Sequence, residues 1–315
     1  MIVMSITLLI FLAGIIMLLI STRIFVDAAT KISFYLRISP LIIGATVVAL
    51  GTSLPELTVS IFAILRGDPG LAAGNIIGSN IANILLVFPI GILFGGIRIG
   101  TTKTQRNGIM LLAATVIFFI LFKYFASPVA GVILIGLAVM FTIKEYQWGI
   151  VGRLHEDLAR FDFLKKKKFK IKTFILLPLS IIGVIIGGFL TVFSVESIAL
   201  ETGFSTTILG FTLTSIATSL PEIFTTVISE KKGEDKMVVG NIIGSNIYNL
   251  MLIGGVILLF ASAKTISLFE WFAFIISAFI LYFLIFFYKG RSIRKLAGII
   301  LLILFTIYLS LIHII

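Results

Sequence analysis

Two glutamates, Glu56 and Glu222, lie inside long apolar stretches of this 315-residue sequence, each directly after a proline. A carboxylate within an apolar span is energetically costly, and it indicates a functional role by default. Pro55 and Pro221 lack the amide hydrogen that would continue a helix, so they interrupt the helix just before each acid. The sequence therefore predicts two buried carboxylates at two helix breaks, a setting that suits the binding of cations.

Further oxygen donors surround each break. The prolines free the carbonyls of Gly51 and Ala217, and we expect the nearby carbonyls of Ala49 and Ser215 to turn with them. The breaks also carry four hydroxyl side chains, Thr52, Ser53, Thr218 and Ser219. Carboxylate, carbonyl and hydroxyl oxygens are the ligands that a hard cation such as Ca²⁺ requires. A simple kink would account for the prolines but not for a glutamate after each of them.

The apolar segments that follow add amides and more hydroxyls, because Gly-Asn-Ile-Ile-Gly-Ser-Asn occurs at both 74–80 and 240–246. Residues four apart share a helix face. On that ground we expect two pairs to point at the glutamates, Ser79 with Asn83 and Ser245 with Asn249. Buried amides must find partners, so four further asparagines are expected to tie helices together rather than to bind ions directly: Asn75, Asn80, Asn241 and Asn246.

The rest of the composition predicts an all-α integral membrane protein. Hydrophobic residues make up 59% of the chain, charged residues 12%, and the mean hydropathy is +1.20. A membrane helix needs about 20 apolar residues. We expect ten spans, at 3–30, 39–65, 70–95, 107–124, 128–143, 173–195, 205–229, 237–262, 268–287 and 295–313.

The first span shows no signal-peptide pattern and is kept as a helix. The chain has no cysteine, so neither disulfides nor thiolate metal sites are possible. His155 and His313, in a polar loop and at the C-terminus, are not expected to be functional.

The two halves of the chain repeat one another. Gly44–Leu86 aligns with Gly210–Leu252 at a constant offset of 166, and 18 of the 43 positions are identical. Five spans per half is an odd number, so the second half must enter the membrane from the opposite side, as in many secondary transporters. We expect a first five-helix repeat at 1–145, a basic loop at 146–172 and an inverted repeat at 173–315, with spans 2 and 7 broken.

The distribution of basic residues predicts the orientation in the cell membrane. Of the 25 Lys and Arg residues, 22 fall on the odd-numbered connections, which are therefore expected to be cytoplasmic. Both termini then lie outside, and the loop 146–172 lies inside. Because the basic residues sit between apolar runs, the net charge of +11 indicates topology rather than nucleic-acid binding. We interpret Lys165–Lys168 as a topology anchor in preference to a regulatory lipid site.

The repeated segments of the sequence resemble those of a known family. The segments 51–56 and 74–83, with their counterparts 217–222 and 240–249, resemble the two alpha-repeats of the cation/calcium exchanger superfamily, and they are most similar to those of the prokaryotic sodium/calcium exchangers. The resemblance implies four cation positions in a diamond, all shared by Glu56 and Glu222. The hydroxyl and amide side chains named above, together with backbone carbonyls, would complete them.

Two positions depart from the family pattern. Ala217 stands where the family usually has glycine, which predicts a stiffer second break. Asn249 stands where potassium-dependent relatives carry aspartate, which argues against potassium dependence. The loop 146–172 is too short for the calcium-sensing domains of animal exchangers, so regulation through such domains is not expected.

The function expected from the sequence is antiport of Ca²⁺ against Na⁺, with no cofactor and no obligate protein partner. One Ca²⁺ neutralises two carboxylates and three Na⁺ leave a charge of +1, so the exchange should be electrogenic. Two protons would also neutralise the pair, which keeps H⁺/Ca²⁺ exchange as the alternative and a passive cation channel as a distant one. An intramembrane enzyme and an ATP-driven pump are disfavoured, since the chain lacks a nucleophile–histidine arrangement and a P-loop.

Overall fold

The computed structural model describes residues 2–35, 49–99, 102–151, 172–231, 235–260 and 266–312, and this part of the chain is helical throughout apart from its connections and one isolated β-bridge between Arg98 and Ser292. Six helices run without a break: α1 (Ile2–Tyr35), α7 (Thr102–Tyr124), α8 (Pro128–Val151), α10 (Lys172–Thr202), α16 (Leu268–Phe287) and α17 (Lys295–Leu311). The fold class expected from the sequence, an all-α protein, is confirmed.

The remaining helices are interrupted, and they correspond between the halves. In the first half they are α3 (Ala49–Thr52), α4 (Leu54–Leu65), α5 (Pro69–Ala82), the π-helical segment η2 (Asn83–Val87) and α6 (Phe88–Phe94). In the second half they are α11 (Thr206–Leu209), the π-helical segment η4 (Gly210–Thr214), α12 (Ser215–Thr218), α13 (Leu220–Lys231), α14 (Asp235–Tyr248), the π-helical segment η5 (Asn249–Ile253) and α15 (Gly254–Phe260).

Eight helices in the described residues are long and apolar enough to cross a membrane, and Leu54–Leu65 and Lys295–Leu311 are shorter apolar helices. All ten fall within or across the expected spans, while the count of ten membrane crossings stays a prediction. The first part of the expected span 39–65 lies outside the described residues. So do most of the loop 146–172, with Lys165–Lys168 and His155, and His313. The helix α8 continues to Val151, beyond the predicted end at 143.

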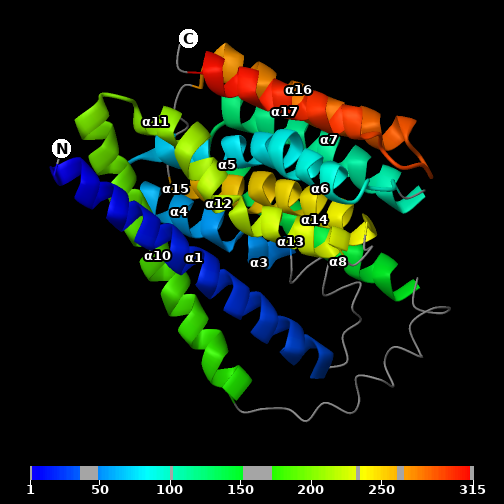
Figure 1. Ribbon diagram of the computed structural model, residues 1–315, viewed down its shortest axis with the longest axis horizontal. Coiled ribbons are helices and arrows are strands. Elements are labelled where there is room, and N and C mark those ends of the chain that lie inside the picture. The colour runs from blue at the N-terminus through cyan, green and yellow to red at the C-terminus, as the bar shows by residue number, and fades with distance from the viewer. Residues whose placement is uncertain are drawn as a thin grey trace.

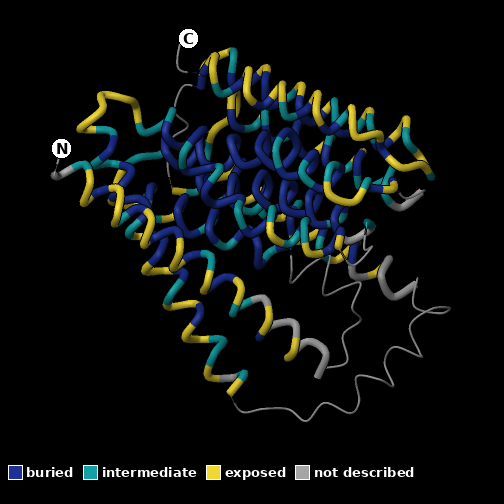
Figure 2. Tube along the Cα trace, viewed as in Figure 1, coloured by how far each residue is buried: buried dark blue, intermediate teal, exposed yellow. Residues whose placement is uncertain are grey.

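The interrupted helices form the interior of the molecule. In Figure 1, α5, α6, α12 and α14 run through the middle, with α1 and α10 along one side and α16 and α17 along the other. Figure 2 shows that the buried trace is concentrated in this middle layer, while α1, α10 and α16 expose one face. The exposed faces are rich in large apolar side chains, such as Leu9 on α1 and Phe283 on α16. An apolar outside with a polar middle is the arrangement expected of a protein in lipid.

The two halves approach most closely where glycines face each other. A Cβ atom added to Gly78 on α5 would lie 2.7 Å from the carbonyl oxygen of Phe211 in η4, and one added to Gly210 would lie 2.8 Å from that of Leu71. The repeat-equivalent Gly244 approaches Ala49 in the same way, at 3.2 Å. The contacts of Gly78 and Gly210 are with backbone atoms, so no side chain can move aside to relieve them, whereas the contact of Gly244 is with the Cβ atom of Ala49. Gly78 and Gly210 therefore allow the halves to pack closely.

This close packing predicts that a methyl group added at Gly78 destabilises the protein. Gly78→Ala should lower the thermal stability of the purified protein by the equivalent of about 1–3 kcal/mol, because the α5–η4 contact has no room for Cβ. Gly136→Ala on α8 is the matched control, since Gly136 is exposed and has no atom within 4 Å of the added Cβ. The measurement is the melting temperature in detergent by fluorescence-detected gel filtration. Equal melting temperatures for the two variants would contradict this account of the interface.

Candidate cation-binding site

The two predicted helix breaks are present, and they have the same backbone geometry. Ser53 separates α3 from α4 with φ −85° and ψ 6°, and Ser219 separates α12 from α13 with φ −80° and ψ 2°. In both places the proline is the second residue of the new helix, where its missing N–H leaves no gap in the hydrogen-bond ladder of that helix. Each glutamate therefore sits in the first turn of a helix, in the middle of the molecule.

Glu56 and Glu222 are completely buried, with an exposed fraction of 0%. Their charges interact with each other, and none of their four carboxylate oxygens has a hydrogen-bond partner among the described residues. Burying an ionised carboxylate without a partner costs several kcal/mol or more. A cation held between the two carboxylates would offset that cost. This pair of uncompensated charges is the central feature of the site.

Thr52 ties the first break to the second half of the chain. Its Oγ1 donates to the carbonyl of Ala49 at 3.2 Å, within its own half, and lies 3.2 Å from Ser245 Oγ and 3.4 Å from Asn241 Oδ1 on α14. Thr52 and Ser245 also interact with the carboxylate of Glu222. A residue of the first break thus lies at the carboxylate of the second.

Thr218 repeats the arrangement from the other side. Its Oγ1 contacts the carbonyl of Ser215 at 3.4 Å, Ser79 Oγ at 3.3 Å and Asn75 Oδ1 at 3.2 Å, and it lies beside the carboxylate of Glu56. Every one of these partners is the repeat-equivalent, at an offset of 166, of a partner of Thr52. The structure therefore brings both breaks and both following helices into one cluster that neither half could build alone.

Three of the four asparagines expected to tie helices together do so. Asn75 Nδ2 donates to the carbonyl of Glu56 at 3.2 Å and to Ser60 Oγ at 3.3 Å, and Asn241 and Asn246 accept hydrogen bonds from the other half. Asn80 is the exception, because its Nδ2 donates to the carbonyl of Ile76 one turn earlier in its own helix. It therefore ties no second helix through that group.

Asn83 and Asn249 each begin a π-helical segment, η2 and η5. Asn83 Nδ2 donates to Asn246 Oδ1 at 3.0 Å, whereas Asn83 Oδ1 and both polar atoms of Asn249 are buried without a partner. π-helical turns inside α-helices frequently mark functional positions, because they widen the helix and shift its face. The sequence spacing indicated these two residues but gave no sign of the π-helical turns.

The other predicted ligands are all buried in the cluster. Ser53 Oγ and Ser219 Oγ have no partner among the described residues, so both are free to coordinate an ion. The carbonyls of Ala49 and Ser215 were expected to turn away from the helix, but they do not. They accept hydrogen bonds from the backbone N–H groups of Ser53 and Ser219 at 3.3 Å and 3.1 Å. A carbonyl oxygen has a second lone pair, so the role of these two carbonyls as ligands stays a prediction.

Three further buried carboxylates are not among the residues that the sequence singles out: Glu145, Glu230 and Glu270, the last of which forms a capping box with Ser267 at the start of α16. Glu145 on α8 forms an ion pair with Arg106 Nη2 at 2.9 Å, which explains its burial. Glu230 at the end of α13 is 7% exposed, and its Oε1 has no partner. In the sequence, Glu230 differs from its repeat-equivalent position, which is Ile64, and nothing else distinguishes it. Among the described residues no group of three or more His, Cys, Asp or Glu gathers, so the central site has two charged ligands and otherwise neutral oxygens.

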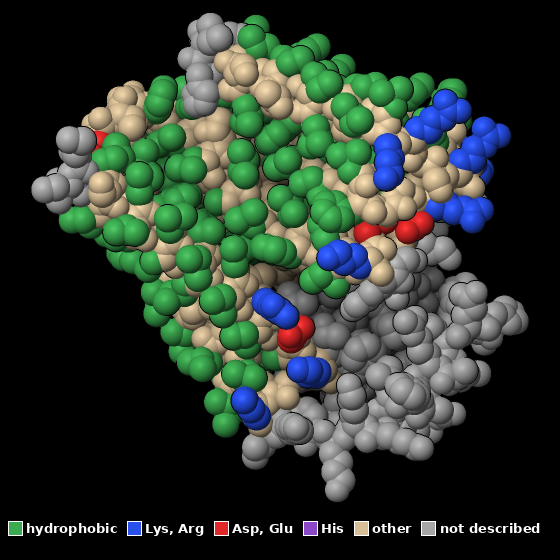
Figure 3. All heavy atoms as spheres, viewed as in Figure 1, with side chains coloured by type: hydrophobic (Ala, Val, Ile, Leu, Met, Phe, Trp, Pro, Cys, Tyr) green, Lys and Arg blue, Asp and Glu red, His purple; other side chains and the backbone are tan. Residues whose placement is uncertain are grey.

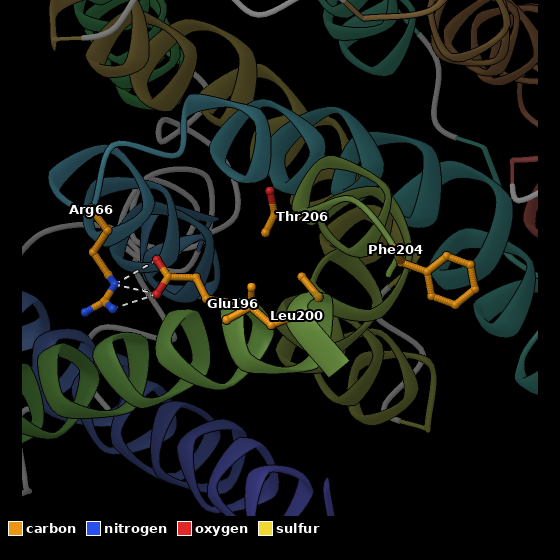
Figure 4. A pocket seen from close by; sticks show the side chains of 6 residues that line it. Arg66, Glu196, Leu200, Phe204 and Thr206 are labelled. Atoms are coloured by element: carbon orange, nitrogen blue, oxygen red, sulfur yellow. Dashed lines mark hydrogen bonds and ion pairs between the residues drawn. The ribbon is translucent and has the colours of Figure 1, made fainter. Parts of the chain in front are cut away.

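A separate surface pocket lies where the ends of α4 and α10 meet, and it contains neither central carboxylate. It has a volume of about 770 Å³ and is lined by Arg66, Glu196, Ala199, Leu200, Phe204 and Thr206. Figure 4 shows the Arg66 guanidinium turned to the Glu196 carboxylate, with Arg66 Nε 2.7 Å from both oxygens. This ion pair joins the first half to α10 at the surface.

Comparisons with known proteins match most of the chain. The family model described as sodium/calcium exchanger protein matches residues 6–145 and 172–313. The chain is 29% identical to the sodium/calcium exchanger MaX1 of Methanosarcina acetivorans, over 97% of this chain and 98% of that protein. It is 34% identical to the putative antiporter CaxA of Alkalimonas amylolytica, over 78% of each. A solved structure of the sodium-calcium exchanger NCX_Mj, soaked with Na⁺ and Sr²⁺, aligns with a TM-score of 0.67 at 30% identity, over 98% of this chain and 99% of that one.

The carboxylate pair predicts the result of neutralising either acid. Glu56→Gln and Glu222→Gln should each weaken Ca²⁺ binding by about a hundredfold or more, because a divalent ion loses one of two formal charges. The measurement is equilibrium ⁴⁵Ca²⁺ binding to purified protein, with gel filtration to verify folding. Glu201→Gln, an exposed acid at the end of α10, is the control and should bind normally. Wild-type affinity in either site variant would overturn the assignment.

Proposed function

The chain belongs to the sodium/calcium exchanger protein family, and on that basis we propose that it exchanges Ca²⁺ for Na⁺ across the cell membrane by alternating access. The observation that carries the proposal is the pair of buried carboxylates, Glu56 and Glu222, which form no ion pair with any of the described residues. The family is one of transporters, so the chain is not an enzyme and requires no cofactor. Ca²⁺ and Na⁺ are its substrates.

The ligand chemistry supports both ions. Two carboxylates supply the charge that Ca²⁺ needs, and the hydroxyl, amide and carbonyl oxygens around them supply further hard ligands. The predicted coordinating residues are Glu56, Glu222, Thr52, Thr218, Ser53, Ser219, Ser79, Ser245, Asn83, Asn249, Ala49 and Ser215. One Ca²⁺ neutralises the pair, whereas three Na⁺ exceed it by one charge. We infer an electrogenic exchange of three Na⁺ for one Ca²⁺.

The architecture supports alternating access. The equivalent contacts of Thr52 and Thr218 relate the halves by a pseudo-symmetry, and an odd number of spans per half would make that relation an inversion across the membrane. In an inverted pair, one half can adopt the arrangement of the other, and the exchange of the two arrangements moves the opening from one face to the opposite one. The central cluster remains at the pseudo-axis throughout.

The charged surface supports the predicted orientation. Figure 3 shows a face covered mostly by hydrophobic side chains, with Lys and Arg at its right-hand end and along its lower edge. The basic residues on odd-numbered connections include Arg98, Arg291 and Arg294, which lie at the ends of α6 and α16. By the positive-inside rule this end faces the cytoplasm, and both termini lie outside.

Exchange is tested by loading proteoliposomes with Na⁺ and diluting them into Na⁺-free medium with ⁴⁵Ca²⁺. Uptake should require internal Na⁺ and should stop when K⁺ replaces it, with the pH equal on both sides. A passive channel would admit ⁴⁵Ca²⁺ without internal Na⁺. Uptake driven by a pH gradient and indifferent to Na⁺ would replace this proposal with H⁺/Ca²⁺ exchange.

Membrane potential distinguishes the two exchange reactions further. With three Na⁺ for one Ca²⁺, one positive charge crosses in each cycle, and a potential of 100 mV should shift the equilibrium Ca²⁺ ratio by roughly fiftyfold. Two protons for one Ca²⁺ would move no net charge. The measurement is ⁴⁵Ca²⁺ accumulation at potentials clamped with valinomycin and K⁺, at a fixed Na⁺ gradient. Accumulation that does not respond to voltage would exclude the electrogenic stoichiometry.

A further inference from the structure

A row of buried polar side chains continues along α13 from the central site to the Lys231 end of the helix. It consists of Glu222, Thr226, Ser229 and Glu230, with exposed fractions of 0%, 0%, 4% and 7%. Residues spaced by three or four lie on the same side of a helix. Glu222 and Glu230 are eight residue steps apart, which is about 12 Å along the helix axis. The row therefore leads from the proposed ion site toward the end that the charge distribution assigns to the cytoplasm.

Four polar atoms of this row lack hydrogen-bond partners among the described residues. Both carboxylate oxygens of Glu222, Thr226 Oγ1 and Glu230 Oε1 are buried and make no hydrogen bond to the described residues. Buried polar groups are normally satisfied, so a succession of unsatisfied ones requires an explanation. Ligand oxygens that receive a passing cation or its water would be left free in this way.

The neighbourhood of Glu230 does not supply a counter-charge. Its carboxylate lies against the backbone of Gly95, at the end of α6, and interacts electrostatically with Asp235 at the start of α14. Asp235 accepts the backbone N–H of Arg98 at 3.1 Å, whereas Arg98 Nε donates to the carbonyl of Gly290 at 3.2 Å. Two carboxylates thus share this end of α13, and within the described residues no ion pair to Glu230 is present.

The first half of the chain does not have this row. The residues equivalent to Thr226, Ser229 and Glu230 are Ser60, Ala63 and Ile64. Ser60 accepts a hydrogen bond from Asn75, and the next two are apolar. A feature required only to hold the repeat together would be expected in both halves. The row occurs in one half alone, so it points to a task specific to one side of the membrane.

We propose that Glu230, with Thr226 between it and Glu222, is a transit site through which hard cations pass between the cytoplasm and the central carboxylates. Glu230 attracts Ca²⁺ and Na⁺ to this end of α13, and the Thr226 hydroxyl provides an oxygen on the way. The inference rests on the proposed exchange function, and it assigns to the cytoplasmic face a binding step that the outer face lacks.

The test compares the two faces of the membrane. Everted vesicles present the cytoplasmic face to external ⁴⁵Ca²⁺, and right-side-out vesicles present the outer face, both loaded with Na⁺. In Glu230→Gln, the half-saturating Ca²⁺ concentration at the cytoplasmic face should rise about fivefold, since one attracting charge is lost. The value at the outer face and the maximal rate should stay within about twofold of wild type, because the central ligands are intact.

Three further variants make the result specific. Glu230→Asp keeps the charge, so its half-saturating Ca²⁺ concentration at the cytoplasmic face should stay within about twofold of wild type. Thr226→Val should raise that concentration by about twofold. Glu201→Gln removes an exposed acid at the opposite end of the molecule and should leave the cytoplasmic value unchanged. A shift that is equal at both faces, or absent in Glu230→Gln, overturns the transit site while wild-type exchange stands. Failure of the wild type to take up Ca²⁺ against Na⁺ overturns the proposed function and this inference with it.

Discussion

The structure depends on one electrostatic constraint, the placement of two carboxylates in the interior, where the described residues provide no ion pair for them. Glu56 and Glu222 are completely buried, and their carboxylate oxygens have no hydrogen-bond partner among the described residues. Such a pair is stabilised by any positive charge that neutralises it, whether a bound cation or protons on the acids. The proline breaks, the hydroxyls that follow them and the glycines that let the helices approach all serve to hold these two side chains at one place.

The same constraint explains why the halves interlock rather than merely pack. Thr52 reaches Ser245 and Asn241 in the second half, and Thr218 reaches Ser79 and Asn75 in the first. Each carboxylate is thus flanked by a threonine from the opposite repeat. A movement of one half relative to the other must disturb the surroundings of both acids together. Ion binding and the relative position of the halves are therefore physically linked.

Much of this could be predicted from the sequence, because it depends on local chemistry that the repeat displays twice. The breaks before Glu56 and Glu222 follow from the prolines, and the shared faces of Ser79 and Asn83 follow from helical spacing. The partners of Thr52 could not be foreseen, since they depend on how the halves cross. The carbonyls of Ala49 and Ser215 stay in their helices because Ser53 and Ser219 still donate to them. Glu230 gave only a weak signal, as a single acid near a helix end is common on protein surfaces.

The π-helical turns at Asn83 and Asn249 also bear on how the chain originated. A π-helical turn contains one residue more than an α-helical turn, so it behaves as the trace of a one-residue insertion. Both turns start at equivalent positions, and no gap separates the repeats between them. We infer that the insertion was already present in a single ancestral half before gene duplication produced the pair. The acid at position 230, which has no counterpart at Ile64, then reflects divergence between the copies after that event.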